Sequence, residues 1–350
     1  MTNSMELVAP AGSFPALRKA IDSGADAVYF GFRDATNARN FPGLNFDNNA
    51  AVDAVNYAHA RGRKIMLALN TYPQPATWSV WTRAIDQAAE LGVDALIVAD
   101  SGLLQYARER YPDLRLHLSV QGSATTHEAI AFYREQFAIE RVVLPRVLSL
   151  SQVRRIIENT DVEIETFAFG SLCVMAEGRC YLSSYVTGES PNTCGACSPA
   201  KAVQWQETPQ GREVRLNGVL IDRYQPGESA GYPVLCKGRF EVNDALGYAI
   251  EEPTSLSVLD ILPQLLRSGV RAIKIEGRQR SPAYVAQVVT VLRQALDAAQ
   301  RSAAQRDAAQ LDAAQRDADS YRVRDDWVTQ LDKLAEGSTH TLGALDRKWQ

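Results

Sequence analysis

The chain has 350 residues, which is enough for one large domain or two ordinary ones with a substantial core. Hydrophobic residues make up 46% and charged residues 22%, which are globular proportions and exclude a disordered or fibrous chain. The net charge of −4 disfavours a general polyanion binder, and no apolar run is long enough for a bilayer span or a signal peptide, so we expect a cytoplasmic protein without a transmembrane segment.

Short apolar strands alternate with longer amphipathic helical segments from the start of the chain. Ser13 is a good N-cap for the first helix, and glycines at 24, 92 and 269 each end a helix just before an apolar run. This repeated joint predicts an α/β fold, the (β/α)8 TIM-like barrel. An open doubly wound sheet is the alternative, but no Gly-x-Gly-x-x-Gly turn follows the first strand. The eight predicted strands are Glu6–Ala9, Ala27–Gly31, Lys64–Asn70, Ala95–Ala99, Leu116–Gln121, Arg141–Pro145, Glu163–Gly170 and Ala272–Glu276.

Two stretches interrupt this alternation of strands and helices. Residues 171–255 are rich in Gly, Pro and Ser and contain every cysteine, which predicts a cysteine-rich insertion after the seventh strand, at the face where barrels build their sites. Residues 298–325 carry Ala/Gln/Arg pentads, most regular in Ala303–Asp317; a five-residue period builds no continuous apolar stripe, so we predict a solvated helical extension without chemistry. The barrel is then expected in residues 1–170 and 256–297, and a short C-terminal tail in 326–350.

All five cysteines fall within 64 residues, with the spacing Cys173-x6-Cys180-x13-Cys194-x2-Cys197-x38-Cys236. Without an export signal, clustered thiols indicate a metal site or redox chemistry rather than structural disulfides. Spacing alone leaves four possibilities open. They are an iron–sulfur cluster, a zinc ion on the first four thiols, a redox dithiol at Cys194 and Cys197, and inert thiols.

The residues around the first two cysteines narrow this choice. Residues 165–183 read Glu-x-Phe, then Gly-Ser-Leu-Cys, then Gly-x-Cys-x-Leu-Ser, and they resemble the signature of peptidase family U-32 throughout. The resemblance extends over the whole chain except the pentads, and it is closest to the branch of the family that serves oxygen-independent ubiquinone biosynthesis. The segments that carry it are Thr36–Phe41, Val143–Leu148, Gly188–Thr193, Ile275–Tyr284 and Arg347–Gln350.

The resemblance implies a 4Fe–4S cluster on four of the cysteines, with Cys194 left out. It implies a heterodimer with the homologous protein UbiV and hydroxylation of a polyprenyl-phenol ubiquinone precursor, presented by a lipid-binding protein or extracted at the membrane surface. Relatives in the family hydroxylate RNA bases, with prephenate implied as the oxygen donor. The alternatives are therefore an RNA-base hydroxylase and a non-catalytic electron-transfer or structural subunit. The implied cluster ligands are Cys173, Cys180, Cys197 and Cys236.

Peptidase activity is not expected despite the family name, because none of the four histidines stands in a His-Glu-x-x-His pair. Polar residues at or just after the ends of predicted strands are the candidates for substrate chemistry, since these ends converge at the mouth of a barrel. An arginine among them could bind a carboxylate of the oxygen donor through two parallel hydrogen bonds. These candidates are Asn70, Gln121, Arg146, Glu276 and Arg278.

Three further polar residues have two interpretations each. Lys274 shares a strand face with Glu276. The two residues form either an ion pair inside the barrel or part of the substrate site. His117, which shares a predicted face with Ser119 and Gln121, is favoured as a hydrogen-bonded core histidine. Arg39, in the long loop after the second strand, is a surface arginine or an anion-binding arm.

Overall fold

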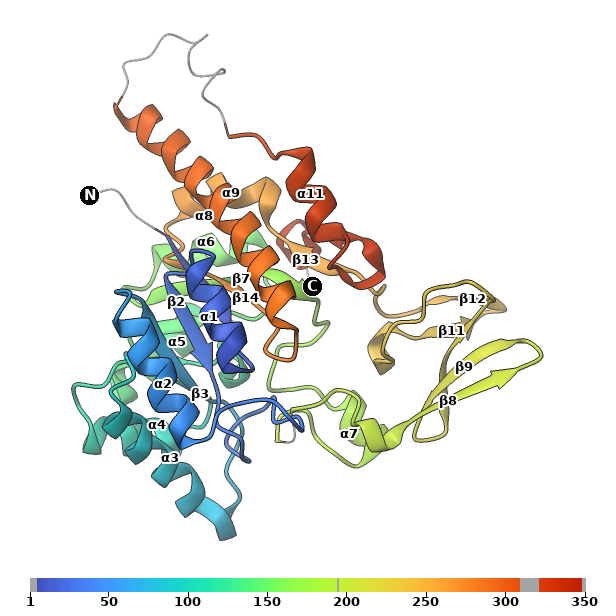
Figure 1. Cartoon of the computed structure of the whole chain (residues 1–350), viewed down its shortest axis with the longest axis horizontal. Helices are drawn as coiled ribbons and strands as arrows, with labels where there is room; N and C mark the ends of the chain where they lie inside the picture. The colour runs from blue at the N-terminus through green and yellow to red at the C-terminus, as the bar shows by residue number, and fades with distance from the viewer. Residues whose placement is uncertain (1–4, 194, 309–320, 348–350) are drawn as a thin grey trace.

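Eight parallel strands close into a barrel in the computed structural model, which describes residues 5–193, 195–308 and 321–347 (Figure 1). Each strand pairs with the next along the chain, and the last strand, β14, pairs with both β7 and β1. The predicted (β/α)8 barrel and its insertion after the seventh strand are confirmed. The barrel strands are β1 (Glu6–Pro10), β2 (Ala27–Phe30), β3 (Lys64–Leu69), β4 (Ala95–Val98), β5 (Leu116–Leu118), β6 (Arg141–Val143), β7 (Glu163–Ser171) and β14 (Ala272–Ile275).

Helices cover the outside of the barrel, and capping residues determine where several of them begin and end. The Ser13 hydroxyl accepts a hydrogen bond from the Ala16 amide at 3.4 Å and so caps the first helix. Gly92 and Gly269 end their helices in the left-handed region, with φ of 70° and 89°. These helices are α1 (Phe14–Asp22), α2 (Asn48–His59), α3 (Trp78–Leu91), α4 (Ser101–Arg110), α5 (His127–Phe137), α6 (Leu150–Glu158), α8 (Leu262–Ser268) and α9 (Pro282–Ala308).

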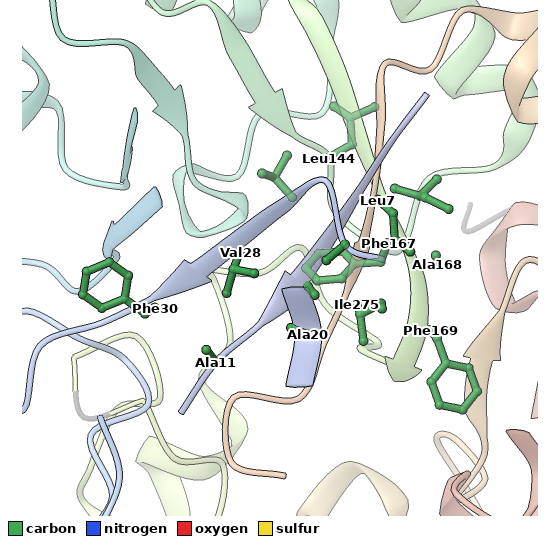
Figure 2. Packing of buried hydrophobic residues seen from close by; sticks show 14 of the residues in the cluster. Leu7, Ala11, Ala20, Val28, Phe30, Leu144, Phe167, Ala168, Phe169 and Ile275 are labelled. Atoms are coloured by element: carbon green, nitrogen blue, oxygen red, sulfur yellow. The ribbon is translucent and has the colours of Figure 1, made fainter. Parts of the chain in front are cut away.

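The main hydrophobic core lies between the strands and this helical layer. Figure 2 shows Leu7, Val28 and Ile275 on barrel strands and Ala20 on α1, all fully or almost fully buried. The barrel interior is a smaller apolar set to which charged side chains are added. Its apolar members are Val8, Ala27, Tyr29, Met66, Ala68, Ala95, Ile97 and Ala272.

Charges inside the barrel are paired across strands. The fully buried Glu165 on β7 accepts hydrogen bonds from Lys274 Nζ at 2.7 Å and from Arg141 Nη1 at 3.3 Å. Lys274 thus forms an ion pair inside the barrel, which is one of its two interpretations, but the partner is Glu165 on the neighbouring strand and not Glu276. Neighbouring strands bring these groups together, whereas residues two apart on one strand are separated by a full pleat repeat.

The predicted hydrogen bonding of His117 is also wrong. His117 lies in register with Ile97 and Arg141 and is 2% exposed, but neither ring nitrogen has a hydrogen-bond partner among the described residues. Burial, together with the nearby Arg141, holds its pKa well below the usual value, so the ring is neutral.

The strand β5 is shorter than predicted. It ends at Leu118, and residues 120–122 form a 3₁₀ turn in which the Ser119 hydroxyl accepts a hydrogen bond from the Gln121 amide at 3.2 Å. This local bond offers the backbone an alternative to the strand. Ser119 and Gln121 therefore do not continue the strand face of His117.

The insertion leaves the barrel at Ser171 and extends to one side of it (Figure 1). It returns through β13 (Ser255–Ser257), which pairs antiparallel with the end of β7, Ser255 opposite Ser171. The excursion thus begins and ends at the same place on the barrel. Between these points lie α7 (Leu182–Thr187), the sheet of β8 (Val203–Thr208), β9 (Gly211–Leu216) and β10 (Val219–Tyr224), and the hairpin of β11 (Arg239–Val242) and β12 (Ala245–Tyr248).

The C-terminal tail packs against the barrel domain. Trp327, on α11 (Asp325–Asp332), is 2% exposed and donates a hydrogen bond to Gln294 on α9 at 3.0 Å. A short strand, β15 (His340–Thr341), pairs parallel with β13. Across the described ranges, no helix combines the length and the apolar character needed to cross a bilayer.

The pentad segment begins inside α9, because this helix runs through the predicted boundary at residue 298. Residues 309–320 lie outside the described residues. Where the described chain resumes, the Tyr321 amide donates to the Ser302 hydroxyl at 3.2 Å. Tyr321 thus packs beside α9, six residues before the end of this helix at Ala308.

Deleting Ala303–Asp317 should change the free energy of unfolding by less than about 1 kcal/mol, because Ser302 and Tyr321 already meet and loop-closure entropy depends weakly on length. Urea denaturation of the deletion variant and of the full chain measures this. The control is Trp327→Ala, which empties a buried site on α11 and should cost about 3–5 kcal/mol. A comparable loss from the deletion would show that the segment packs against the fold.

Candidate functional site

Four thiols gather near the mouth of the barrel. Cys173 follows β7, Cys180 and Cys197 lie on either side of α7, and Cys236 lies in a turn between the two small sheets. Burial is the main cause of the raised pKa values of Cys173, Cys197 and Cys236, and neighbouring thiols add to it. Cys197 interacts electrostatically with each of the other three thiols, so the four form one connected set. Cys194, which the resemblance leaves out of the ligand set, lies outside the described residues.

Burial keeps the thiols of Cys173, Cys197 and Cys236 protonated near neutral pH when they hold no metal, because it raises the pKa of each. Burial raises the pKa of Cys173 and of Cys236 to about 12. Within the described parts of the chain, no three His, Cys, Asp or Glu side chains are arranged as ligands of a metal ion. A bound cation would reverse this balance, since thiolate is the ligand form and metal binding releases the protons.

Arg146 holds the first cysteine loop, which carries Cys173 and Cys180, against the barrel. Its Nε donates to Glu177 Oε1 at 2.6 Å, its Nη1 donates to the Ser171 carbonyl, and its guanidinium lies 4.4 Å from the centre of the Phe167 ring. Glu177 stands between Cys173 and Cys180 in sequence, so this ion pair positions the loop that carries both thiols. Sequence reasoning missed Glu177, although it lies inside the nineteen-residue signature.

The loop after β2 contacts the second cysteine loop, which contains Gly195 and Cys197. Arg39 Nη1 donates to the Gly195 carbonyl, and Gly195 packs so tightly that a Cβ there would lie 1.2 Å from the Ala38 carbonyl oxygen. The predicted site residue Asn70 supports this contact, because its side-chain oxygen accepts a hydrogen bond from the Ala38 amide at 3.0 Å. Asn70 therefore orders the loop.

Glu276 and Arg278 follow β14 at the mouth. Burial would raise the pKa of Glu276, but Arg39 and Arg146 outweigh burial and lower it, so the carboxylate is ionised. Arg278 is 4% exposed, and its Nη1 donates to Asn37 Oδ1 at 2.5 Å. Burial, with a contribution from Arg39, lowers the pKa of Arg278 to about 10. Sequence reasoning did not identify Asn37, which lies within one of the segments that carry the family resemblance.

Two acceptor atoms at the mouth lack donors. Gln121 Oε1 and Glu177 Oε2 are buried and find no hydrogen-bond partner in the part of the chain that the structure describes. The two residues are neighbours, since a Cβ on Gly178 would lie 2.0 Å from the Gln121 carbonyl oxygen and the Ser123 hydroxyl donates to the Glu177 carbonyl at 2.5 Å. Unpaired buried acceptors are costly, and a hydroxyl group or a water molecule would satisfy them.

Comparison with known proteins places these residues in a family. The family model described as Peptidase family U32 matches residues 12–338. The chain is 33% identical to the tRNA hydroxylation protein P of Escherichia coli (strain K12), over 84% of this chain and 68% of that protein. It is also 33% identical to the uncharacterized protease MJ0090 of Methanocaldococcus jannaschii, over 84% and 65%, and to the 23S rRNA 5-hydroxycytidine C2501 synthase of E. coli, over 85% and 40%. The chain thus spans about two thirds or less of the length of these three relatives.

Gly195→Ala should disrupt the docking of the second cysteine loop, because the new Cβ collides with the Ala38 carbonyl. The matched control is Gly188→Ala, since Gly188 has the same φ of 74° but no atom within 4 Å of its Cβ position. Both variants carry the same left-handed strain of about 1 kcal/mol. Limited proteolysis within residues 188–200 should accelerate at least fivefold only for Gly195→Ala. Equal acceleration in both variants would show that the contact with Ala38 does not order the loop.

Proposed function

The chain belongs to peptidase family U32, and we propose that it is the iron–sulfur subunit of an oxygen-independent hydroxylase that acts on ubiquinone precursors. One observation carries the proposal. Four thiols of one insertion, connected electrostatically through Cys197, lie beside the mouth of a barrel whose relatives include proteins named for RNA hydroxylation. Hydroxylation without dioxygen needs electron transfer and another source of oxygen, which suits a thiolate-bound cluster next to a substrate site.

The residues present fit a 4Fe–4S cluster. Cys173, Cys180, Cys197 and Cys236 would hold it, because four soft thiolate donors are the usual ligand set of such clusters. Arg39 and Arg146 donate to carbonyls of the cysteine loops and would offset the negative charge of the thiolates. The bound cluster would supply one-electron transfer. A zinc ion on the same thiols is the alternative.

The side chains at the mouth supply the remaining functions. Gln121 Oε1 and Glu177 Oε2 are acceptors for the hydroxyl of a phenolic ring, and the ionised Glu276 can accept a proton during the reaction. An arginine at the mouth would bind a carboxylate of the oxygen donor, for which prephenate is proposed. The resemblance to the ubiquinone-biosynthesis branch of the family implies UbiV as the partner in a heterodimer. The polyprenyl chain implies a lipid-binding protein that presents the substrate.

RNA is the second candidate substrate, because two of the relatives described above are named for RNA hydroxylation. The charge of the insertion speaks against it. Residues 171–255 contain 10 acidic and 7 basic side chains, which together repel a phosphate backbone. A third candidate is an electron-transfer or structural subunit, with the hydroxylation chemistry on UbiV.

The first test concerns the cluster. Anaerobically purified protein should be brown, with close to four iron and four sulfide per chain. Serine at each of Cys173, Cys180, Cys197 and Cys236 should remove most of the iron, since a hydroxyl is a poor ligand for it. The matched control, Cys194→Ser, should keep it. Colourless protein with one tightly held zinc, or iron loss only in the control, would refute the assignment.

The second test concerns the reaction. The purified chain together with UbiV should hydroxylate a ubiquinone precursor under anaerobic conditions, whereas the chain alone should not. Unmodified RNA supplied to the same complex should remain unmodified. Oxygen-isotope labelling identifies the source of the new hydroxyl, and label arriving from dioxygen gas would overturn the oxygen-independent reaction. Hydroxylated RNA with untouched precursor would establish the second candidate instead.

A further inference from the structure

Three arginines gather at the mouth, and two of them contact the cysteine loops. Arg146 donates to the Ser171 carbonyl and Arg39 donates to the Gly195 carbonyl. Burial raises the pKa of the Cys197 thiol, and Arg39 and Arg146 both oppose that rise. These two guanidinium groups therefore face the thiols, and their positive charges favour the thiolate form.

Arg278 has different surroundings. Its guanidinium contacts Asn37 and lies 5.7 Å from the centre of the Tyr29 ring, and its backbone is fixed where a Cβ on Gly12 would lie 1.8 Å from the Arg278 carbonyl oxygen. No hydrogen bond or ion pair of the described residues joins Arg278 to the insertion. Its position depends on β2, on the loop after β2 and on the turn after β1. All three belong to the barrel.

Arg278 also differs from the other buried cations in having no counter-ion. Arg141, Arg146 and Lys274 each form an ion pair with a glutamate, whereas no carboxylate of the described residues lies within 4 Å of the Arg278 guanidinium. Glu276 is the neighbouring carboxylate, but its hydrogen bonds are with the Ser171 amide and Gln279. A buried charge without a partner destabilises the fold, and a bound anion would offset that cost.

One edge of this guanidinium is free. Asn37 occupies Nη1, while Nε and Nη2 donate to no group in the described part of the chain. Neither atom is among the fully buried side-chain atoms without a partner, so the edge retains contact with solvent. Nε and Nη2 together form the edge that a carboxylate occupies with two parallel hydrogen bonds.

The neighbours hold this edge in place. Asn37 Nδ2 donates to the Phe32 carbonyl at 2.9 Å, which orients the amide so that its oxygen faces Arg278. Gly31 leaves room for the pair, because a Cβ there would lie 2.5 Å from the Asn37 side chain and 2.6 Å from Arg278 Nη1. The guanidinium is thus fixed before any ligand arrives, which lowers the entropy cost of binding.

We propose that Arg278, oriented by Asn37, binds a carboxylate of a small organic acid, while Arg39 and Arg146 balance the charge of the thiols. The inference deepens the proposed hydroxylase function, since the acid would be the oxygen donor or an acidic ring precursor. Carboxylate binding itself requires no turnover. It can therefore be tested whether or not the chain hydroxylates anything.

The test is calorimetry on the anaerobically purified full chain, with prephenate, malonate and inorganic phosphate as separate probes. Arg278→Gln should weaken binding of prephenate and malonate about 10- to 100-fold, the range expected for losing hydrogen bonds to a charged group, and leave the metal content unchanged. Arg280→Gln is the matched control, because this arginine lies two residues away with a side chain 37% exposed, and it should bind both acids normally. Arg146→Gln should instead lower the metal content.

Two further variants separate binding from folding. Arg278→Lys keeps the charge but loses the two-pronged edge, so it should bind the acids nearly as weakly as Arg278→Gln. Arg278→Ala should regain binding when methylguanidinium is added, which a purely structural role would not allow. Unchanged binding in Arg278→Gln, phosphate bound more tightly than either acid, or loss of metal in all Arg278 variants would overturn the proposal. Acid binding without hydroxylation would refute only the proposed function.

Discussion

The ion pair between Arg146 and Glu177 is the contact on which the arrangement of the site depends. It joins the end of a barrel strand to the middle of the first cysteine loop, and both side chains are more than nine-tenths buried. Breaking a buried pair by removing one partner leaves the other charge uncompensated, at a cost of about 3–5 kcal/mol. The loop can therefore leave its place only at a high cost. In this way the barrel fixes the position of the loop that carries Cys173 and Cys180.

The arginines at the mouth illustrate how a barrel divides one residue type among several tasks. Arg146 faces a carboxylate and a carbonyl of the insertion, Arg39 bridges two loops, and Arg278 stands on the barrel with a free edge. The three come from loops after β6, β2 and β14, far apart in the chain. Fixed cations placed before a reaction begins are effective in a site from which water is excluded.

Much of the fold could be predicted because most barrel strands after β1 are largely apolar runs that follow a helix and a turn. The cysteine insertion was visible because this rhythm stops after Gly170. The pairing inside the barrel was not, because the partner of Lys274 depends on how β7 and β14 are staggered, which neither strand reveals alone. Arg146 and Arg278 also looked equivalent in sequence, since both follow strands. Only their contacts, with Glu177 for one and with Asn37 for the other, distinguish them.

The pairing of β7 with β14 has a consequence for how the chain is made. These strands are neighbours, with Phe169 opposite Ile275, although the whole insertion separates them in sequence. At a synthesis rate of roughly 5–20 residues per second, seven strands wait about 5–20 s for the eighth. During that time the edges of β1 and β7 stay open, and open strand edges invite pairing with other chains. β13 is made before β14 and also pairs with the last residues of β7, but on the opposite edge, because Phe169 has Ser257 of β13 on one side and Ile275 of β14 on the other. The insertion thus delays the closing of the barrel and leaves the edge that awaits β14 open while it is made.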